Sequence, residues 1–257
     1  MTIYEKVSIV LSIIAIIIPT IVIPILNYLY KKFFKSPKLK HYVTGRAILY
    51  FNLSGSYIRI DGVYESQRNS TSIKNVTLQI TRNTDNQKLN LQWSTFVSPV
   101  SQQLLGNFSS TVETAHPFRI ENDSITCAFV EYADVDGSAN RTLNPLHVNL
   151  AKNVEELFQT STTLDEAKEK YVATNEYISL KNEAMGFFYW KIGKYTVELQ
   201  TKYENKLATF KYEFEVNETT NSDLIFNFEE MLLTPLYNRY GLPTNKKAVL
   251  VELREVS

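Results

Sequence analysis

The stretch EYADVDGSANR, residues 131–141, could coordinate a hard cation, because side-chain oxygens occur at alternate positions: Asp134, Asp136, Ser138 and Asn140. Calcium binds where several such oxygens converge from one loop. An EF-hand loop, however, needs glycine at its sixth position and an acidic residue at its twelfth. Counted from Asp134, this chain has Gly137 at the fourth position and Pro145 at the twelfth. A turn between two strands explains the same residue types. We therefore favour a turn and predict no metal ligand.

Other residues that could do chemistry are scattered. The histidines His41, His116 and His147 form no H-E-x-x-H motif, and no G-x-S-x-G motif or closely spaced glycine loop occurs. The single cysteine, Cys127, lies in the alternating stretch SITCAFVEY, which predicts a buried strand position, and no nearby basic residue or histidine would stabilise its thiolate. We expect no catalytic residue, no cofactor and no enzymatic activity.

The concentrated charge is a lysine cluster that follows an apolar segment. Residues 7–30 contain no charged side chain, and a helix of this length would reach roughly 35 Å, enough for a bilayer core of about 30 Å. A cleaved signal peptide is the alternative, but it would have a shorter apolar region and a small-residue cleavage site. The sequence therefore predicts a short flank at residues 1–6, a transmembrane helix at 7–30 and a basic juxtamembrane segment at 31–40.

Lysine residues near a span favour the cytoplasmic side, so we expect an N-terminus outside and a cytoplasmic C-terminal domain. The same cluster is the predicted membrane-surface site, where it would bind anionic lipid headgroups: Lys31, Lys32, Lys35, Lys38 and Lys40. Seven Asn-x-Ser/Thr triplets argue for the opposite orientation, although a chain rich in these residues forms such triplets by chance.

Residues 41–257 carry the signature of an antiparallel β domain. Apolar and polar residues alternate at 76–81, 89–94, 194–203 and 208–216, which predicts two hairpins with one face in a core. Further strands are expected at 48–52, 57–64, 118–120, 125–132, 146–150 and 248–253. Helices are expected near 163–178, with Thr163 and Glu166 as a capping box, and near 227–240, with Asn227 and Glu230 at its start. Pro235 would kink or delay the second helix.

The pattern W-x-x-G-x-Y-x-V, from Trp190 to Val197, resembles a strand of an immunoglobulin-type sandwich, with tryptophan and tyrosine in the core. The fold expected from these observations is mainly β: a single transmembrane helix followed by an immunoglobulin-like antiparallel β-sandwich with one or two helical insertions. The lone cysteine excludes an internal disulfide.

The charge balance of the chain limits the possible functions more than its motifs do. The 27 basic and 27 acidic residues balance, so nucleic acid is not an expected partner. The first hypothesis is a membrane-anchored, non-catalytic protein that binds a protein partner or scaffolds an assembly at the membrane surface. The alternative is a sensor-effector whose soluble domain controls oligomerisation of the transmembrane helices and membrane permeability. Expected partners are the lipid bilayer, an unidentified protein and other copies of the chain.

Overall fold

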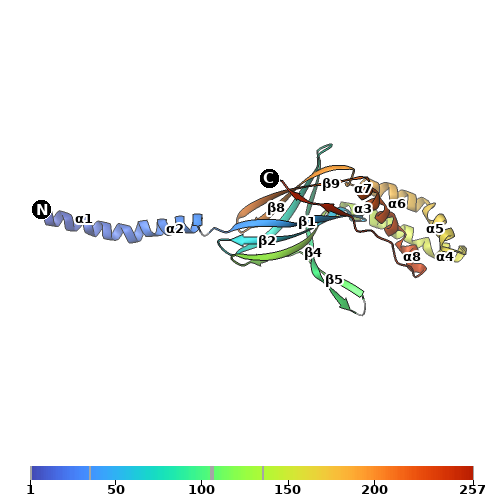
Figure 1. Ribbon diagram of the computed structural model, residues 1–257, viewed down its shortest axis with the longest axis horizontal. Coiled ribbons are helices and arrows are strands. Elements are labelled where there is room, and N and C mark those ends of the chain that lie inside the picture. The colour runs from blue at the N-terminus through green and yellow to red at the C-terminus, as the bar shows by residue number, and fades with distance from the viewer. Residues whose placement is uncertain (1, 35, 105–106, 135, 257) are drawn as a thin grey trace.

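The computed structural model describes residues 2–34, 36–104, 107–134 and 136–256. It consists of an N-terminal helical projection, a strand-rich body and helices at the far end of that body (Figure 1). The elements, in chain order, are α1 (Ile3–Ile17), η1 (Ile18–Val22), α2 (Ile23–Phe34), β1 (Lys38–Asn52), β2 (Gly55–Gln67), β3 (Thr71–Arg82), β4 (Gln87–Leu104), β5 (Asn107–Thr114), β6 (Phe118–Ile120), β7 (Ser124–Ala133), α3 (Ser138–Lys152), α4 (Val154–Thr160), α5 (Leu164–Val172), α6 (Asn175–Met185), β8 (Gly193–Tyr203), β9 (Lys206–Val216), α7 (Glu218–Leu232), α8 (Thr234–Arg239), β10 (Leu250–Glu252) and β11 (Arg254–Glu255).

The N-terminal projection is divided near Pro19. Proline has no amide hydrogen, and η1, which has this proline at its start, is a π-helical turn between α1 and α2. With 15 residues, α1 extends only about 22 Å, less than a bilayer core of about 30 Å. In the described parts of the chain, no helix combines the length and apolar character needed to cross a membrane. The predicted transmembrane helix at 7–30, and the single-pass topology drawn from it, are therefore wrong.

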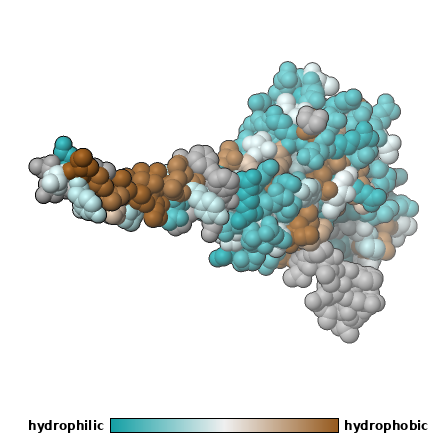
Figure 2. All heavy atoms as spheres, turned by 60° about the vertical axis from the view of Figure 1, so that its left-hand side comes forward, coloured by the Kyte–Doolittle hydropathy of each residue, from teal (hydrophilic) through white to brown (hydrophobic). Residues whose placement is uncertain are grey.

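The projection still exposes apolar side chains, as the brown surface in Figure 2 shows, whereas the visible face of the body is mainly hydrophilic. Of the predicted membrane-surface residues, Lys31 and Lys32 lie at the end of α2, and Lys38 and Lys40 lie in β1. Lys35 is outside the described residues. Headgroup binding by these lysines stays a prediction.

The body is one antiparallel sheet that nearly closes into a barrel. The strand order is β10-β1-β2-β7-β4-β3-β8-β9-β11, with β5 beside β4 and β6 beside β3. Strands β10 and β11 stand at opposite ends of this order but are separated by Leu253 alone, so the C-terminal segment bridges β1 and β9. Long twisted strands coil in this way until the sheet edges meet. The predicted immunoglobulin-like sandwich is therefore wrong, because the two expected layers are opposite walls of one sheet.

Both predicted hairpins are confirmed, because alternation of apolar and polar residues sets the inward face of each strand. In β9, Tyr212, Phe214 and Val216 are buried and the charged residues between them are exposed. Strands β8 and β9 pair from Gly193 and Val216 to Tyr203 and Lys206. The expected hairpin of β3 and β4 is likewise paired in register.

Helices α3 to α6 follow β7, and α7 and α8 follow β9; together they cover one end of the barrel (Figure 1). We call this the helix-covered end, and the end where β1 begins the opposite end. The strand predicted at 146–150 is wrong, since these residues belong to α3. Leu143 and Leu150 are buried seven residues apart, which is also helical spacing, so five alternating residues were too few to distinguish the two structures.

Helix termini were predicted with mixed success. The Thr163 side chain accepts a hydrogen bond from the Glu166 amide, so the predicted N-cap is confirmed. The Glu166 carboxylate accepts from the Thr162 amide, one residue before the N-cap, so the second bond of the predicted capping box is displaced by one residue. The predicted start at Asn227 is wrong: α7 begins at Glu218 and is capped by Asn217. A new helix, α8, begins at Thr234, so Pro235 marks a helix start, where proline costs no hydrogen bond.

The core at the helix-covered end is aromatic. Trp190 is fully buried and its indole N–H donates to the Tyr50 carbonyl oxygen at 2.8 Å. The Tyr195 ring stacks on Phe214 with 4.9 Å between centroids. The core positions expected for this tryptophan and tyrosine are thus confirmed, although the sheet they fill is a barrel.

Candidate functional site

Strand β4 separates from β7 partway along the barrel wall. The two strands pair as far as Phe96 and Val130, after a bulge between Trp93 and Thr95. A bulge bends a strand and increases its twist, which turns β4 away from the wall. From there on, β4 pairs with β5 alone among the described residues.

The departure of β4 leaves part of β7 as an edge. Residues 124–129 pair with residues 61–66 of β2 on one side and, in the described chain, with no strand on the other. The backbone N–H and C=O groups of such an edge are available to another strand. We call residues 124–129 the free edge of β7. Residues 97–104 and 107–114, which project from the barrel in Figure 1, are the β4–β5 arm.

A groove of about 480 Å³ lies beside residues 126–129 of the free edge. Thr126 and Ala128 line it from the inward face of β7, and Cys127 and Phe129 line it from the outward face. Side chains from both faces of one strand can line a single groove only where that groove lies beside the strand edge. The remaining lining residues are Phe96, Val97, Glu113, His116, Phe118 and Arg119.

The wall opposite the free edge is aromatic. The Phe96 ring lies 5.5 Å from His116 and 5.8 Å from Phe118, both in edge-to-face geometry. Phe118 also contacts Tyr64 inside the barrel at 6.0 Å. Edge-to-face packing of this kind is favourable and fixes the ring orientations. The groove thus has an apolar wall that is continuous with the barrel core.

Polar groups lie at the rim of the groove. The Arg119 Nε atom is 3.0 Å from a Glu121 carboxylate oxygen, and its Nη2 donates to the Ser70 hydroxyl at 3.1 Å.

Cys127 is exposed, so its predicted burial is wrong; the inward positions of β7 are Ala128, Val130 and Tyr132.

The stretch with cation-binding potential forms a turn. The Asp134 carboxylate accepts hydrogen bonds from the Asp136 and Ser138 amides and from the Ser138 hydroxyl at 2.9 Å. Asn140 lies in α3. Within the residues that the structure describes, no group of three or more His, Cys, Asp or Glu side chains could hold a metal ion.

A second polar cluster fills the barrel interior toward the opposite end. His41 Nδ1 lies 2.8 Å from the Tyr212 hydroxyl, and the Tyr64 hydroxyl lies 3.1 Å from the Thr201 hydroxyl. Burial lowers the pKa of His41 to about 3 and raises the pKa of Tyr64, so both are neutral at pH 7. Thr71 is also buried there, and its hydroxyl has no hydrogen-bond partner.

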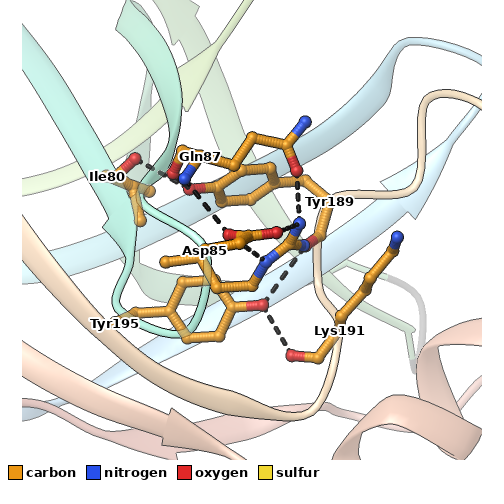
Figure 3. A network of polar contacts seen from close by, with 7 residues as sticks. Ile80, Asp85, Gln87, Tyr189, Lys191 and Tyr195 are labelled. Atoms are coloured by element: carbon orange, nitrogen blue, oxygen red, sulfur yellow. Dashed lines mark hydrogen bonds and ion pairs between the residues drawn. The ribbon is translucent and has the colours of Figure 1, made fainter.

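The helix-covered end has a polar network of a different kind (Figure 3). The buried Arg82 guanidinium donates to both carboxylate oxygens of Asp85 at 3.0 and 2.6 Å, to the Tyr189 carbonyl at 2.8 Å and to the Gln87 side chain. The Tyr189 hydroxyl donates to the Ile80 carbonyl at 2.8 Å. The hydrogen bond from Arg82 lowers the pKa of Asp85 to about 2. These bonds hold the β3–β4 turn against the chain before β8, so we assign the network a structural role.

The groove residues were not predicted as a site, and the histidines are as dispersed as their spacing implied. His41 lies inside the barrel, His116 at the groove and His147 in α3. One available signal was the stretch 125–130, which, apart from Thr126, is apolar in both alternating phases. A strand that is apolar on both faces needs cover on both, and this chain supplies it on only part of the outward face.

Comparisons with known proteins give no family. No protein-family model matches the chain, and no curated protein sequence matches it. Among solved structures, a family 123 glycoside hydrolase from Clostridium perfringens has 12% identity and a TM-score of 0.29 over 71% of this chain and 27% of its own. The sporulation control protein Spo0M from Bacillus subtilis has 8% identity and a TM-score of 0.27 over 76% of this chain and 54% of its own. The chain thus spans about a quarter and about half of these proteins, and likenesses this distant assign it neither a fold family nor an activity.

Proposed function

We propose that this protein is a non-catalytic binding module that holds an extended segment of a protein partner along the free edge of β7. The proposal retains the protein partner inferred from the sequence and drops the membrane anchor. The sensor-effector alternative required transmembrane helices and is dropped with it.

The observation that carries the proposal is the separation of β4 from β7 after Phe96 and Val130. It leaves backbone donors and acceptors of residues 126–129 beside a groove, where the described chain places no strand. Peptides that add a strand to a sheet edge gain affinity from such main-chain hydrogen bonds.

The groove supports specificity as well as affinity. Phe96 and Phe118 form an apolar wall, and Glu113 and Arg119 place opposite charges at the rim. In a bound strand, alternate side chains would point toward the wall and toward solvent. The preferred segment is therefore extended, with apolar or aromatic residues at every second position.

A peptide screen tests the proposal. Full-length protein, kept in a nonionic detergent because α1 and α2 expose apolar side chains, is panned against a random heptapeptide phage library. An enriched peptide is then synthesised in two N-methylated forms, one methylated at odd and one at even positions. Because alternate amides of a bound strand face β7, we expect one form to lose at least about tenfold in affinity while the other binds as the parent does. Equal affinity of both forms would sink the proposal.

The lone cysteine provides a control at the groove itself. Cys127 is exposed and lines the groove, so coupling a fluorescein maleimide to its thiol should block peptide binding. The same treatment of the Cys127→Ser variant should leave binding unchanged. Undiminished binding to the labelled wild type would show that the peptide sits elsewhere and would contradict the assignment of this groove.

A further inference from the structure

The β4–β5 arm is the second feature of the wall that lacks a neighbour. Strand β5 pairs with β4 from Thr114 to Asn107 and, among the described residues, with no other strand. A two-stranded hairpin on its own is marginally stable in water. Val112, on the arm, has 55% of its surface exposed. A partner strand that covers the outer edge of the arm would therefore stabilise the arm.

The arm is long enough to cover the free edge of β7 and resembles it in composition. Strand β5 has eight residues and the free edge spans positions 124–129, or about 20 Å at the rise of a β-strand. The free edge contains no charged residue, and β5 contains only Glu113. Neither strand has the lysine or proline with which proteins commonly block edge pairing.

The need for an open strand edge favours an arm over a whole barrel wall as the occupant. In the described chain, β5 is paired with β4 on one side and with no strand on the other, so it can offer an edge to β7. A strand within another barrel wall is paired on both sides and offers none.

We infer that the occupant of the groove is the β4–β5 arm of a second copy of this chain, and that two copies exchange arms about a two-fold axis. The inference rests on the proposed function and names its partner. Arm exchange is self-complementary, so one pairing generates two identical contacts and closes as a dimer. In each contact, β5 of one copy adds to the free edge of β7 of the other.

The lone cysteine makes the contact directly testable. Val112→Cys is introduced into full-length protein that retains Cys127, and the protein is oxidised at low micromolar concentration with copper phenanthroline. We expect a disulfide-linked dimer that is lost on reduction. Three controls should give no such dimer: the wild type, Val112→Cys with Cys127→Ser, and Val148→Cys, whose new thiol replaces an exposed residue of α3. No dimer, an internal 112–127 disulfide, or equal dimer yield from Val148→Cys would overturn the inference.

A synthetic peptide of residues 107–114, NFSSTVET, identifies the contact independently of cysteine chemistry. Light scattering should give wild-type protein a mass of two chains, and excess peptide should reduce it to one chain of 29.6 kDa, whereas a scrambled peptide should not. A wild-type mass of one chain, or a dimer that resists the peptide, would contradict arm exchange. If library peptides still bind such a monomer in the groove, the proposed function survives while arm exchange fails; if no peptide binds, both fail.

Discussion

The two ends of the barrel differ in how their strands and core are covered. At the helix-covered end, α3 to α8 lie over the strand ends, and Trp190 and the Arg82 network fill the space beneath them. Toward the opposite end, β4 leaves the wall, the aromatic rings of Phe96 and Phe118 border a groove, and the Thr71 hydroxyl is buried without a partner.

This difference separates the end where polar groups are paired within the fold from the end where a strand edge is open to a partner. Every donor of Arg82 named above has an acceptor, as expected for a group whose desolvation would otherwise be costly. In the described chain, the free edge of β7 pairs with a strand on one side only, so a partner strand can use the backbone groups on its other side. Stability is concentrated at one end, and binding capacity at the other.

The largest expected effect compares two phenylalanine truncations. Phe228 in α7 is fully buried against Phe51, so Phe228→Ala should lower the free energy of unfolding by about 3–5 kcal/mol. Phe118 borders the groove and is only partly buried, so Phe118→Ala should cost about 1 kcal/mol. Urea unfolding followed by circular dichroism measures both. Equal losses in the free energy of unfolding would contradict the proposed difference in stability between the two ends.

The next effect is pH dependence at the opposite end. The pKa of His41 is about 3 in the folded chain and is normally 6.5, so below pH 6.5 the unfolded state binds more protons. His41 therefore makes stability fall as the pH drops from 6.5 toward 3, by up to about 1.4 kcal/mol per pH unit. Unfolding measured between pH 7 and 5 should show a steeper slope in the wild type than in His41→Gln, where burial of His147, which also lowers its pKa, leaves a residual slope. His116→Gln, which changes an exposed ring, should retain the slope.

A smaller, opposite pair of effects concerns two buried threonines. Thr71→Val removes a hydroxyl that has no partner, so it should raise the free energy of unfolding by about 1 kcal/mol. Thr201→Val removes one hydrogen-bond partner of the Tyr64 hydroxyl and should lower the free energy of unfolding by about 1 kcal/mol. Thermal and urea unfolding of both variants measure the difference. A loss of stability in Thr71→Val would mean that its hydroxyl is satisfied.

The smallest effect concerns Cys127. Because its side chain is exposed, Cys127→Ser should change the free energy of unfolding by less than about 0.5 kcal/mol. In dilute native wild type, at concentrations where the chain is monomeric, the thiol should react with dithionitrobenzoate within seconds to minutes and without denaturant. A thiol that reacts only in urea would instead support burial, and the groove as described would be closed.

Local sequence patterns predicted much of the fold. Strict alternation predicted β9, the polar break predicted its hairpin with β8, and Thr163 with Glu166 predicted a helix start, since each depends on residues close in sequence. Short patterns failed where two periods fit equally well, as at residues 146–150. The candidate site could not be read in this way, because its walls come from β4, β6 and β7 and from the residues between β5 and β6.

By itself, the amino-acid sequence determined the strand-rich character of residues 41–257, the inward faces of their main strands and the absence of an internal disulfide. The tertiary structure decided that these strands form one coiled sheet, because alternation specifies a buried face but not which strand supplies the cover. It also decided that Pro19 divides the N-terminal segment, since apolar composition does not report the hydrogen-bond ladder. Finally, it placed Cys127 on the outward face beside a groove, because β4 leaves β7 after a bulge. No local sequence pattern predicted that bulge.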